Sequence, residues 1–495
     1  MKRAAGILLP VASLPSKYGI GAFTEEAYDF VRFLAKAGQQ YWQILPLGPT
    51  GYGDSPYQSF STFAGNPYFI DLDVLVDMGL LTHAEIENTD LGTNPERVDY
   101  EKIYYGRNAL LKKAFARCTW ELSGYRTFES ENAYWLEDYA LYSAIKEHFG
   151  SVSFLEWPEE VRRREESVLA EFRETLADTI ELYKFQQYLF SIKWHALKEY
   201  ANQQGIQIIG DLPIYVALDS ADTWAHPELF QLKEDGLPSA VAGCPPDAFA
   251  ADGQLWGNPL YDWEYHEKTG YAWWMQRLGK ALELYDIVRI DHFRGFDSYY
   301  SIPYGDKTAA NGHWEIGPGK KLIDCINETY GSDRVIAEDL GYLTDSVMEL
   351  VRHSGYPGMK VIQFAFDSRE AGNYLPHNYD KNTVVYTGTH DNDTMAGWCV
   401  NVDRDDYRMA QRYMDFTDET IPDGHPEKKF IRLVLGAVSD TAVIPMQDYL
   451  GLGSEARINT PSTLGTNWLW RMRKDALTDE LAEEIRELTE LYGRL

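Results

Sequence analysis

Three short segments of the chain end an apolar, β-branched run with carboxylates. They are residues 286–295 (DIVRIDHFRG), 334–341 (RVIAEDLG) and 384–394 (VVYTGTHDNDT). Such runs are typical of strands that a parallel sheet buries on both faces, and in a barrel the loops after the strands carry the catalytic side chains. Three carboxylates gathered at one barrel mouth could break and remake glycosidic bonds, because that chemistry uses a pair of acidic side chains.

The candidate catalytic residues in these segments are Asp291, Glu338 and Asp391. Retention of configuration needs a carboxylate nucleophile and a carboxylic acid about 5–5.5 Å apart. Arg289 lies two residues before Asp291 on the same strand face, so its charge favours an ionised Asp291. Glu338 follows an apolar run that could raise its pKa and keep it protonated. A single such carboxylate could equally cap a helix or pair with an arginine, but three in succession favour the catalytic interpretation.

Eight β-branched candidate strands are spread along the chain, with helical patterns between several of them. They cover residues 6–9, 41–47, 206–216, 286–293, 334–340, 359–366, 383–389 and 442–449. The clearest helix covers residues 24–37, with Thr24 as its expected N-cap and Gly38 at its end. Eight strands alternating with helices predict an α/β fold, the (β/α)8 TIM barrel, and a doubly wound open sheet is the alternative.

The spacing of these strands also predicts the domain organisation. We expect one catalytic barrel over residues 1–495, with a mainly helical insertion at about 50–185 that includes helices at 104–117, 131–149 and 159–182. A second insertion at about 219–273 is rich in Pro, Gly, Asp and aromatic residues, which predicts a loop-rich cover for part of the active site. The last helix ends the chain, and this leaves no room for a C-terminal β-domain.

The composition limits the classes of partner. With 46 basic and 76 acidic side chains the formal charge is −30, which disfavours nucleic acid and anionic membranes and suits a neutral substrate. No apolar run approaches the roughly 18 residues of a membrane span, and four scattered cysteines fit a reducing compartment, so we expect a cytoplasmic protein. Aromatic residues make up 14% of the chain; they could stack on sugar rings, although composition alone favours a role in the core. We expect no cofactor and no metal, because neither a complete nucleotide-binding glycine motif nor metal-ligand spacing is present.

The three acidic segments resemble the signature segments of the amylomaltases, which are the 4-α-glucanotransferases or disproportionating enzymes of glycoside hydrolase family 77, relatives of the α-amylases. The resemblance covers nearly the whole chain. It includes residues 48–57 (GPTGYGDSPY), 210–216 (GDLPIYV), 243–247 (GCPPD), 255–261 (LWGNPLY) and 457–461 (RINTP). It implies a (β/α)8 barrel with inserted subdomains and without the C-terminal β-domain of the amylases.

The resemblance also implies roles for individual residues. Asp291 would be the nucleophile, Glu338 the general acid/base and Asp391 the stabiliser of the transition state. Sugar contacts at the cleavage point are implied for Arg289, His390 and Asp211, with His292 beside them; Tyr52, Asp54 and Ser55 would lie in the loop over the donor and acceptor sites, and Asp247 and Trp256 in a loop covering the acceptor side.

The implied reaction transfers α-1,4-glucan segments between maltooligosaccharides through a covalent glucosyl-enzyme, in a monomer or a weak homo-oligomer. Two alternatives remain at this point: an α-amylase-like hydrolase with the same carboxylates, and a non-catalytic glucan-binding protein on the same scaffold.

Overall fold

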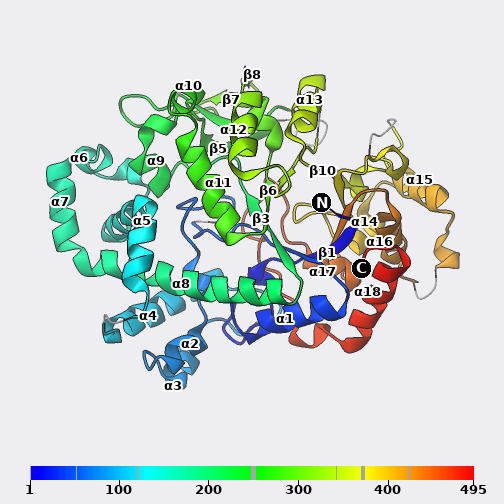
Figure 1. The fold of residues 1–495 in the computed structure, drawn as a ribbon, viewed down its shortest axis with the longest axis horizontal. Coiled ribbons are helices and arrows are strands. Elements are labelled where there is room, and N and C mark those ends of the chain that lie inside the picture. Colours follow the sequence, from blue (N-terminus) through cyan, green and yellow to red (C-terminus); the bar gives the residue numbers. More distant parts are fainter. Residues whose placement is uncertain are drawn as a thin grey trace.

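The computed structural model describes residues 2–51, 53–119, 122–246, 252–341, 343–369, 374–421 and 424–495. Its centre is a sheet of eight parallel strands, at the positions that the sequence predicts (Figure 1). These strands are β1 (Ala4–Leu8), β2 (Tyr41–Gln43), β3 (Gln207–Leu212), β6 (Ile287–Ile290), β9 (Val335–Ala337), β10 (Gly358–Val361), β11 (Thr383–Tyr386) and β12 (Thr441–Pro445). The predicted fold class is confirmed.

The strands follow one another around a closed barrel in the order β10-β11-β12-β1-β2-β3-β6-β9. The first and last strands of this order meet through the Ala337 backbone N–H, which donates to Pro357 O at 3.0 Å. Close packing inside the barrel wall requires a glycine at 210, because a Cβ there would lie 2.0 Å from Cγ of Tyr285. The alternative of an open, doubly wound sheet is therefore wrong.

Helices surround the barrel. They include α1 (Glu25–Lys36), α8 (Ala177–Gln203), α11 (Ala272–Leu284), α12 (Lys320–Tyr330), α13 (Asp345–Ser354), α14 (Met395–Asn401), α15 (Arg404–Met414), α16 (Glu427–Gly436), α17 (Met446–Tyr449) and α18 (Asp479–Leu491). Thr24 precedes α1 as predicted, but its hydroxyl donates to Glu26 Oε2 at 2.7 Å instead of capping the helix. None of the helices in the described part of the chain is both long and apolar enough to cross a bilayer.

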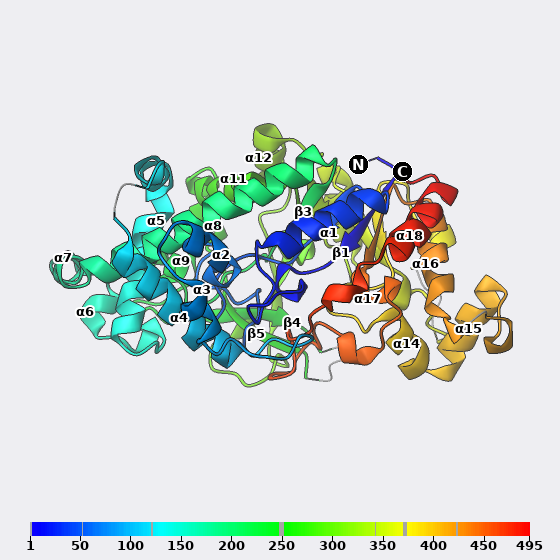
Figure 2. The same cartoon turned by 90° about the horizontal axis from the view of Figure 1, so that it is seen from below.

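The chain between β2 and β3 is mainly helical and extends away from the barrel (Figures 1 and 2). Its helices are α2 (Leu72–Asp77), α3 (His83–Glu87), α4 (Tyr100–Arg117), α5 (Tyr125–His148), α6 (Glu159–Arg162) and α7 (Glu166–Thr175), followed by α8. The predicted helix at 159–182 is instead the succession α6, α7 and the start of α8, because Arg164 adopts a left-handed backbone conformation (φ 56°) that interrupts it. Since α8 continues without a break from this region to the barrel, the end of the insertion near residue 185 stays a prediction.

A second sheet, which the sequence analysis did not predict, lies beside the barrel. It is antiparallel, in the order β5-β4-β7-β8, and consists of β4 (Ala240–Cys244), β5 (Gln254–Pro259), β7 (Ser298–Pro303) and β8 (His313–Ile316). The region at 219–273, expected to be loop-rich, thus contains β4 and β5 as well as α9 (Ala221–Ala225) and α10 (Trp263–Lys268). Its strands are short and contain Gly or Pro, and the other two strands of the sheet lie outside the region, so local patterns could not reveal the sheet.

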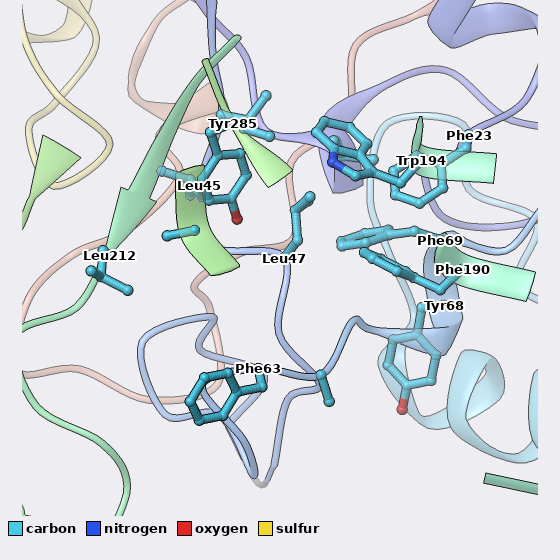
Figure 3. Close-up of a cluster of buried hydrophobic side chains, with 14 of the residues drawn as sticks. Phe23, Leu45, Leu47, Phe63, Tyr68, Phe69, Phe190, Trp194, Leu212 and Tyr285 are labelled. Carbon is cyan, nitrogen blue, oxygen red and sulfur yellow. The ribbon is translucent and has the colours of Figure 1, made fainter. Parts of the chain in front are cut away.

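Aromatic side chains connect the barrel to the helical region. The ring of Phe23 lies 5.1 Å from Trp194, 5.3 Å from Phe190 and 5.7 Å from Phe69, between centroids (Figure 3). Trp194 and Phe190 belong to α8, whereas Phe69 lies in the helical region before α2. Many aromatic residues therefore fill the core, as the composition alone favoured.

Candidate active site

The three candidate catalytic carboxylates follow three barrel strands at the same end of the barrel. Asp291 comes directly after β6, Glu338 directly after β9, and Asp391 five residues after the end of β11. Backbone hydrogen bonds bring the first two together: the N–H of His292, next to Asp291, donates to Glu338 Oε2 at 2.7 Å. The N–H of Phe293 donates to the backbone oxygen of Glu338 at 3.0 Å. The loop after β6 is thus fixed against the end of β9.

Arg289 forms an ion-pair network inside the barrel. Asp211 on β3 and Arg289 on β6 are register partners in neighbouring parallel strands, so their side chains meet on one face. Arg289 Nη1 donates to both carboxylate oxygens of Asp211 at 2.7 Å, and Nη2 lies 3.0 Å from Asp291 Oδ1. Its Nε donates to the sulfur of Met359 at 3.2 Å. The predicted proximity of Arg289 and Asp291 is confirmed.

Asp211 is held in a fully buried environment. Its side chain has no exposed surface, and its oxygens accept from Arg289 and, at 2.6 Å, from the Tyr57 hydroxyl. The expected contact between Asp211 and a sugar stays a prediction. Asp211 holds the guanidinium that contacts Asp291.

Glu338 and the adjacent Asp339 have different environments. Glu338 Oε1 accepts from the Leu340 N–H at 2.8 Å, in addition to the His292 contact at Oε2. Asp339 is buried and accepts from the Met359 N–H at 2.7 Å, across the junction of β9 and β10. Strand alternation thus separates the two carboxylates as expected, and Asp339 serves to close the barrel.

The carboxylates of this site affect one another's protonation. Burial raises the pKa of Asp291 to about 8; Arg289 acts in the opposite direction, and the charges of Asp211, Glu338 and Asp391 raise it further. Burial also raises the pKa of Glu338, as predicted from its apolar strand. One guanidinium faces the carboxylates of Asp211, Asp291 and Glu338. Because these groups interact strongly, their proton losses belong to the set of carboxylates and not to either residue alone.

Asp391 is more exposed and is held mainly by uncharged groups. Its side chain is 46% exposed, compared with 29% for Asp291. The Asn459 amide donates to Asp391 Oδ1 at 2.6 Å, and Arg457 Nη2 donates to the Asp391 backbone oxygen at 2.7 Å. His390 Nε2 lies 3.4 Å from the same Oδ1, and burial lowers the pKa of His390, which keeps its ring neutral.

Tyr57 connects the two sides of the site. Its ring stacks on that of His390, with centroids 5.0 Å apart and an interplanar angle of 17°, while its hydroxyl binds Asp211. Tyr57, Asn459 and Arg457 were not among the predicted site residues, although all three lie in the motifs at 48–57 and 457–461. Loop residues have no periodicity, so the sequence offered only these motifs as a signal.

His292 and Trp256 lie against each other beside Glu338. Their rings meet edge to face at 4.8 Å, and burial lowers the pKa of His292 to about 3. His292 has a left-handed backbone conformation (φ 48°), unusual for a residue other than Gly, in which its N–H reaches Glu338. The predicted proximity of His292 to the site agrees with this arrangement.

Of the remaining predicted residues, the structure describes Asp54 and Ser55. Asp54 is half-buried, and burial raises its pKa to about 6; the Ser55 hydroxyl accepts from the Tyr57 N–H at 3.3 Å. This hydrogen bond links their loop to the site through Tyr57. Tyr52 and Asp247 lie outside the residues that the structure describes.

A parallel eight-stranded barrel with paired acidic residues after its strands is the architecture of barrel enzymes that act on glycosidic bonds. Comparison with known proteins is more specific. The family model described as 4-alpha-glucanotransferase matches residues 9–478. The 4-alpha-glucanotransferase of Clostridium butyricum is 49% identical to this chain, over 98% of the chain and 99% of its own length. The 4-alpha-glucanotransferase of Streptococcus pneumoniae is also 49% identical, over 100% of the chain and 98% of its own length.

Among solved structures, the amylomaltase from Streptococcus agalactiae in complex with acarbose superposes with a TM-score of 0.96 at 42% identity, and the match covers 100% of both chains. The chain belongs to the 4-alpha-glucanotransferase family. The activity predicted from the resemblance is thereby confirmed.

Proposed function

We propose that this 4-α-glucanotransferase works by double displacement, with Asp291 as nucleophile, Glu338 as acid and base, and Asp391 as stabiliser of the transition state. The observation that carries the proposal is the His292 N–H bound to Glu338, because it fixes the loop that begins with Asp291 against the end of β9. Retention requires these two groups about 5–5.5 Å apart, across one glycosidic bond.

In the first step, Asp291 attacks the anomeric carbon of an α-1,4-linked glucose while Glu338 donates its proton to the departing 4-oxygen. The glycosidic bond breaks, and an ester bond between Asp291 and the sugar forms. The proton that Glu338 gives up in this step is replaced in the second step. Arg289 supports the assignment, since its guanidinium contacts Asp291 and favours the ionised form there.

In the second step, the 4-hydroxyl of another glucan chain enters, and the now ionised Glu338 accepts its proton. The new oxygen–carbon bond forms as the ester bond breaks, and Asp291 leaves as a carboxylate. Asp391 would bind sugar hydroxyls and favour the distorted, cation-like ring, which its exposed side chain permits. His390 and Arg289 retain their proposed places beside this sugar, whereas Asp211 acts through Arg289.

We further propose that the substrates are maltooligosaccharides and related α-1,4-glucans, since the related Streptococcus agalactiae amylomaltase binds acarbose. Trp256 would contribute to the cover that keeps water from the covalent intermediate, because its ring already packs on His292. A cytoplasmic location is proposed from the four free cysteines.

Incubation with maltotriose tests the proposal. A transferase converts it into a ladder of shorter and longer chains, a hydrolase gives shorter chains alone, and a binding protein leaves it unchanged. Asp291→Asn should abolish the ladder while glucan binding persists. Normal turnover by this variant would remove Asp291 from the mechanism.

A further inference from the structure

A buried carboxylate outside the catalytic groups lies behind the loop that carries Asp391. Asp448 belongs to α17, which directly follows β12, and the residue is 2% exposed. Burial raises the pKa of Asp448 to about 7, which shows how unfavourable an ionised carboxylate is at this position. A buried acceptor of this kind is tolerated where it is hydrogen-bonded.

The two oxygens of Asp448 bind the two ends of one loop. Oδ2 accepts from the Thr387 hydroxyl at 2.5 Å, directly after β11. Oδ1 accepts from the backbone N–H of Met395 at 2.6 Å, the first residue of α14. Both partners are fully buried. The seven residues 388–394, which include His390 and Asp391, are thus flanked by two buried residues that both bind the Asp448 side chain.

The loop is cross-linked internally and is also bound to the chain after β10. Asn392 Oδ1 accepts from both the backbone N–H and the hydroxyl of Thr389, at 2.8 and 2.9 Å. Gln363 Nε2 donates to the backbone oxygen of Asp393 at 2.7 Å. A segment held together in this way moves as a unit when its ends move, so a displacement at Asp448 would be transmitted to Asp391.

We propose that Asp448 is a positioning residue for glucan transfer, which sets the place of Asp391 by holding both ends of its loop. The inference rests on the proposed role of Asp391. Asp448 touches neither substrate nor reacting atoms, and its effect is on the rate of the chemical step. An error of about 1 Å in the placement of a catalytic group can lower a rate by about 100-fold.

The test compares kcat, KM for maltotriose and Tm among matched variants. We expect Asp448→Ala to lower kcat about 10- to 100-fold with KM changed by less than about threefold, because binding depends on many other contacts. Asp448→Asn should restore kcat to within about threefold, since the amide can accept from Met395 N–H and donate to Thr387. Thr387→Val, which removes one of the two contacts, should fall between them.

Asp286→Ala is the matched control. Asp286 precedes β6 at the opposite end of the barrel and accepts from the Ile208 N–H at 2.8 Å and from Asn202 Nδ2. This variant should lower Tm and leave kcat within about twofold, because its contacts are remote from the mouth. An equal fall in kcat in this variant would show that general loosening, not positioning, causes the effect.

An unchanged kcat in Asp448→Ala would overturn the inference, as would failure of Asp448→Asn to restore it. If Asp448→Ala does not fold, the other two variants decide the question. A kcat near that of the parent in Asp448→Asn, together with a lower kcat in Thr387→Val, supports the inference. A parent-like kcat in Thr387→Val overturns it. Asp391→Ala, measured in parallel, separates the two claims. Full activity there refutes the proposed role of Asp391, whereas a large loss there with a normal Asp448→Ala refutes the role of Asp448 alone.

Discussion

Asp291 and Asp391 share one barrel mouth but are held in opposite ways. Asp291 is set by the barrel wall, through an arginine that bridges it to Asp211 on the neighbouring strand. Asp391 lies on a loop, where an asparagine amide binds its carboxylate. The difference indicates two requirements. The protonation state of the nucleophile Asp291 must be controlled, whereas the stabilising carboxylate Asp391 must mainly be held in position.

Of the two carboxylates compared, removing the nucleophile Asp291 should have the largest effect on kcat. Asp291→Asn should lower kcat by a factor on the order of 10⁴ or more, as expected when a group essential to covalent catalysis is lost. Binding of a maltooligosaccharide, measured by calorimetry, should change little because the amide has the same shape. Loss of binding together with turnover would indicate a collapsed site instead.

Removing the bridging cation tests the charge side of the comparison. Arg289→Met leaves the buried Asp211 and the partly exposed Asp291 without their shared counter-charge, which should cost about 3–5 kcal/mol of stability and lower kcat by more than about 100-fold. Without the guanidinium the pKa of Asp291 rises, so the acidic limb of the kcat/KM profile should move to higher pH. A limb that stays in place would show that Arg289 does not control the ionisation of Asp291.

Asn459 tests the placement side. A hydrogen bond to a charged group is worth about 1.5–3 kcal/mol, so Asn459→Ala should lower kcat about 10- to 100-fold. The acidic limb that Asp291 sets should keep its position, since Asn459 is uncharged and contacts Asp391, not Asp291. A shift like that of Arg289→Met would contradict the distinction between the two sides.

The smallest loss of kcat is expected at Tyr57, which contacts both Asp211 and His390. Tyr57→Phe keeps the ring on His390 and removes the hydroxyl that binds Asp211, whose other hydrogen bonds come from Arg289. We expect a loss of about 1 kcal/mol in stability and less than about tenfold in kcat, measured by chemical unfolding and initial rates. A loss as large as that of Arg289→Met would mean that Tyr57 controls the ion network.

The barrel was predictable because its strands are β-branched runs that carry their signal locally. The same logic placed Arg289 beside Asp291 and separated Glu338 from Asp339, since strand alternation is a property of the sequence. The antiparallel sheet was missed because β4 and β7 pair across 50 or more residues of intervening chain, which no local pattern records.

The site, like the fold, was predictable only where the signal is local in the sequence. Carboxylates at strand ends could be identified, but the burial of Asp211 depends on Tyr57, which arrives from a loop 154 positions away in sequence. Asn459 lies 68 positions from Asp391, and Asp448 lies 61 positions from Thr387, so these contacts also join distant parts of the chain. Their roles depend on tertiary contacts, so they become visible only in the folded chain.

The central claim is that Asp291 and Glu338 act on opposite sides of one glycosidic bond. An α-maltooligosaccharyl fluoride tests it directly, because fluoride departs without an acid, so Glu338→Gln should form the glycosyl ester yet lack the base to transfer it onward. Mass spectrometry of the quenched variant, followed by peptide mapping, should locate the added glycosyl group on Asp291. Attachment at another residue, or no trapped ester while the fluoride is consumed, would contradict the account.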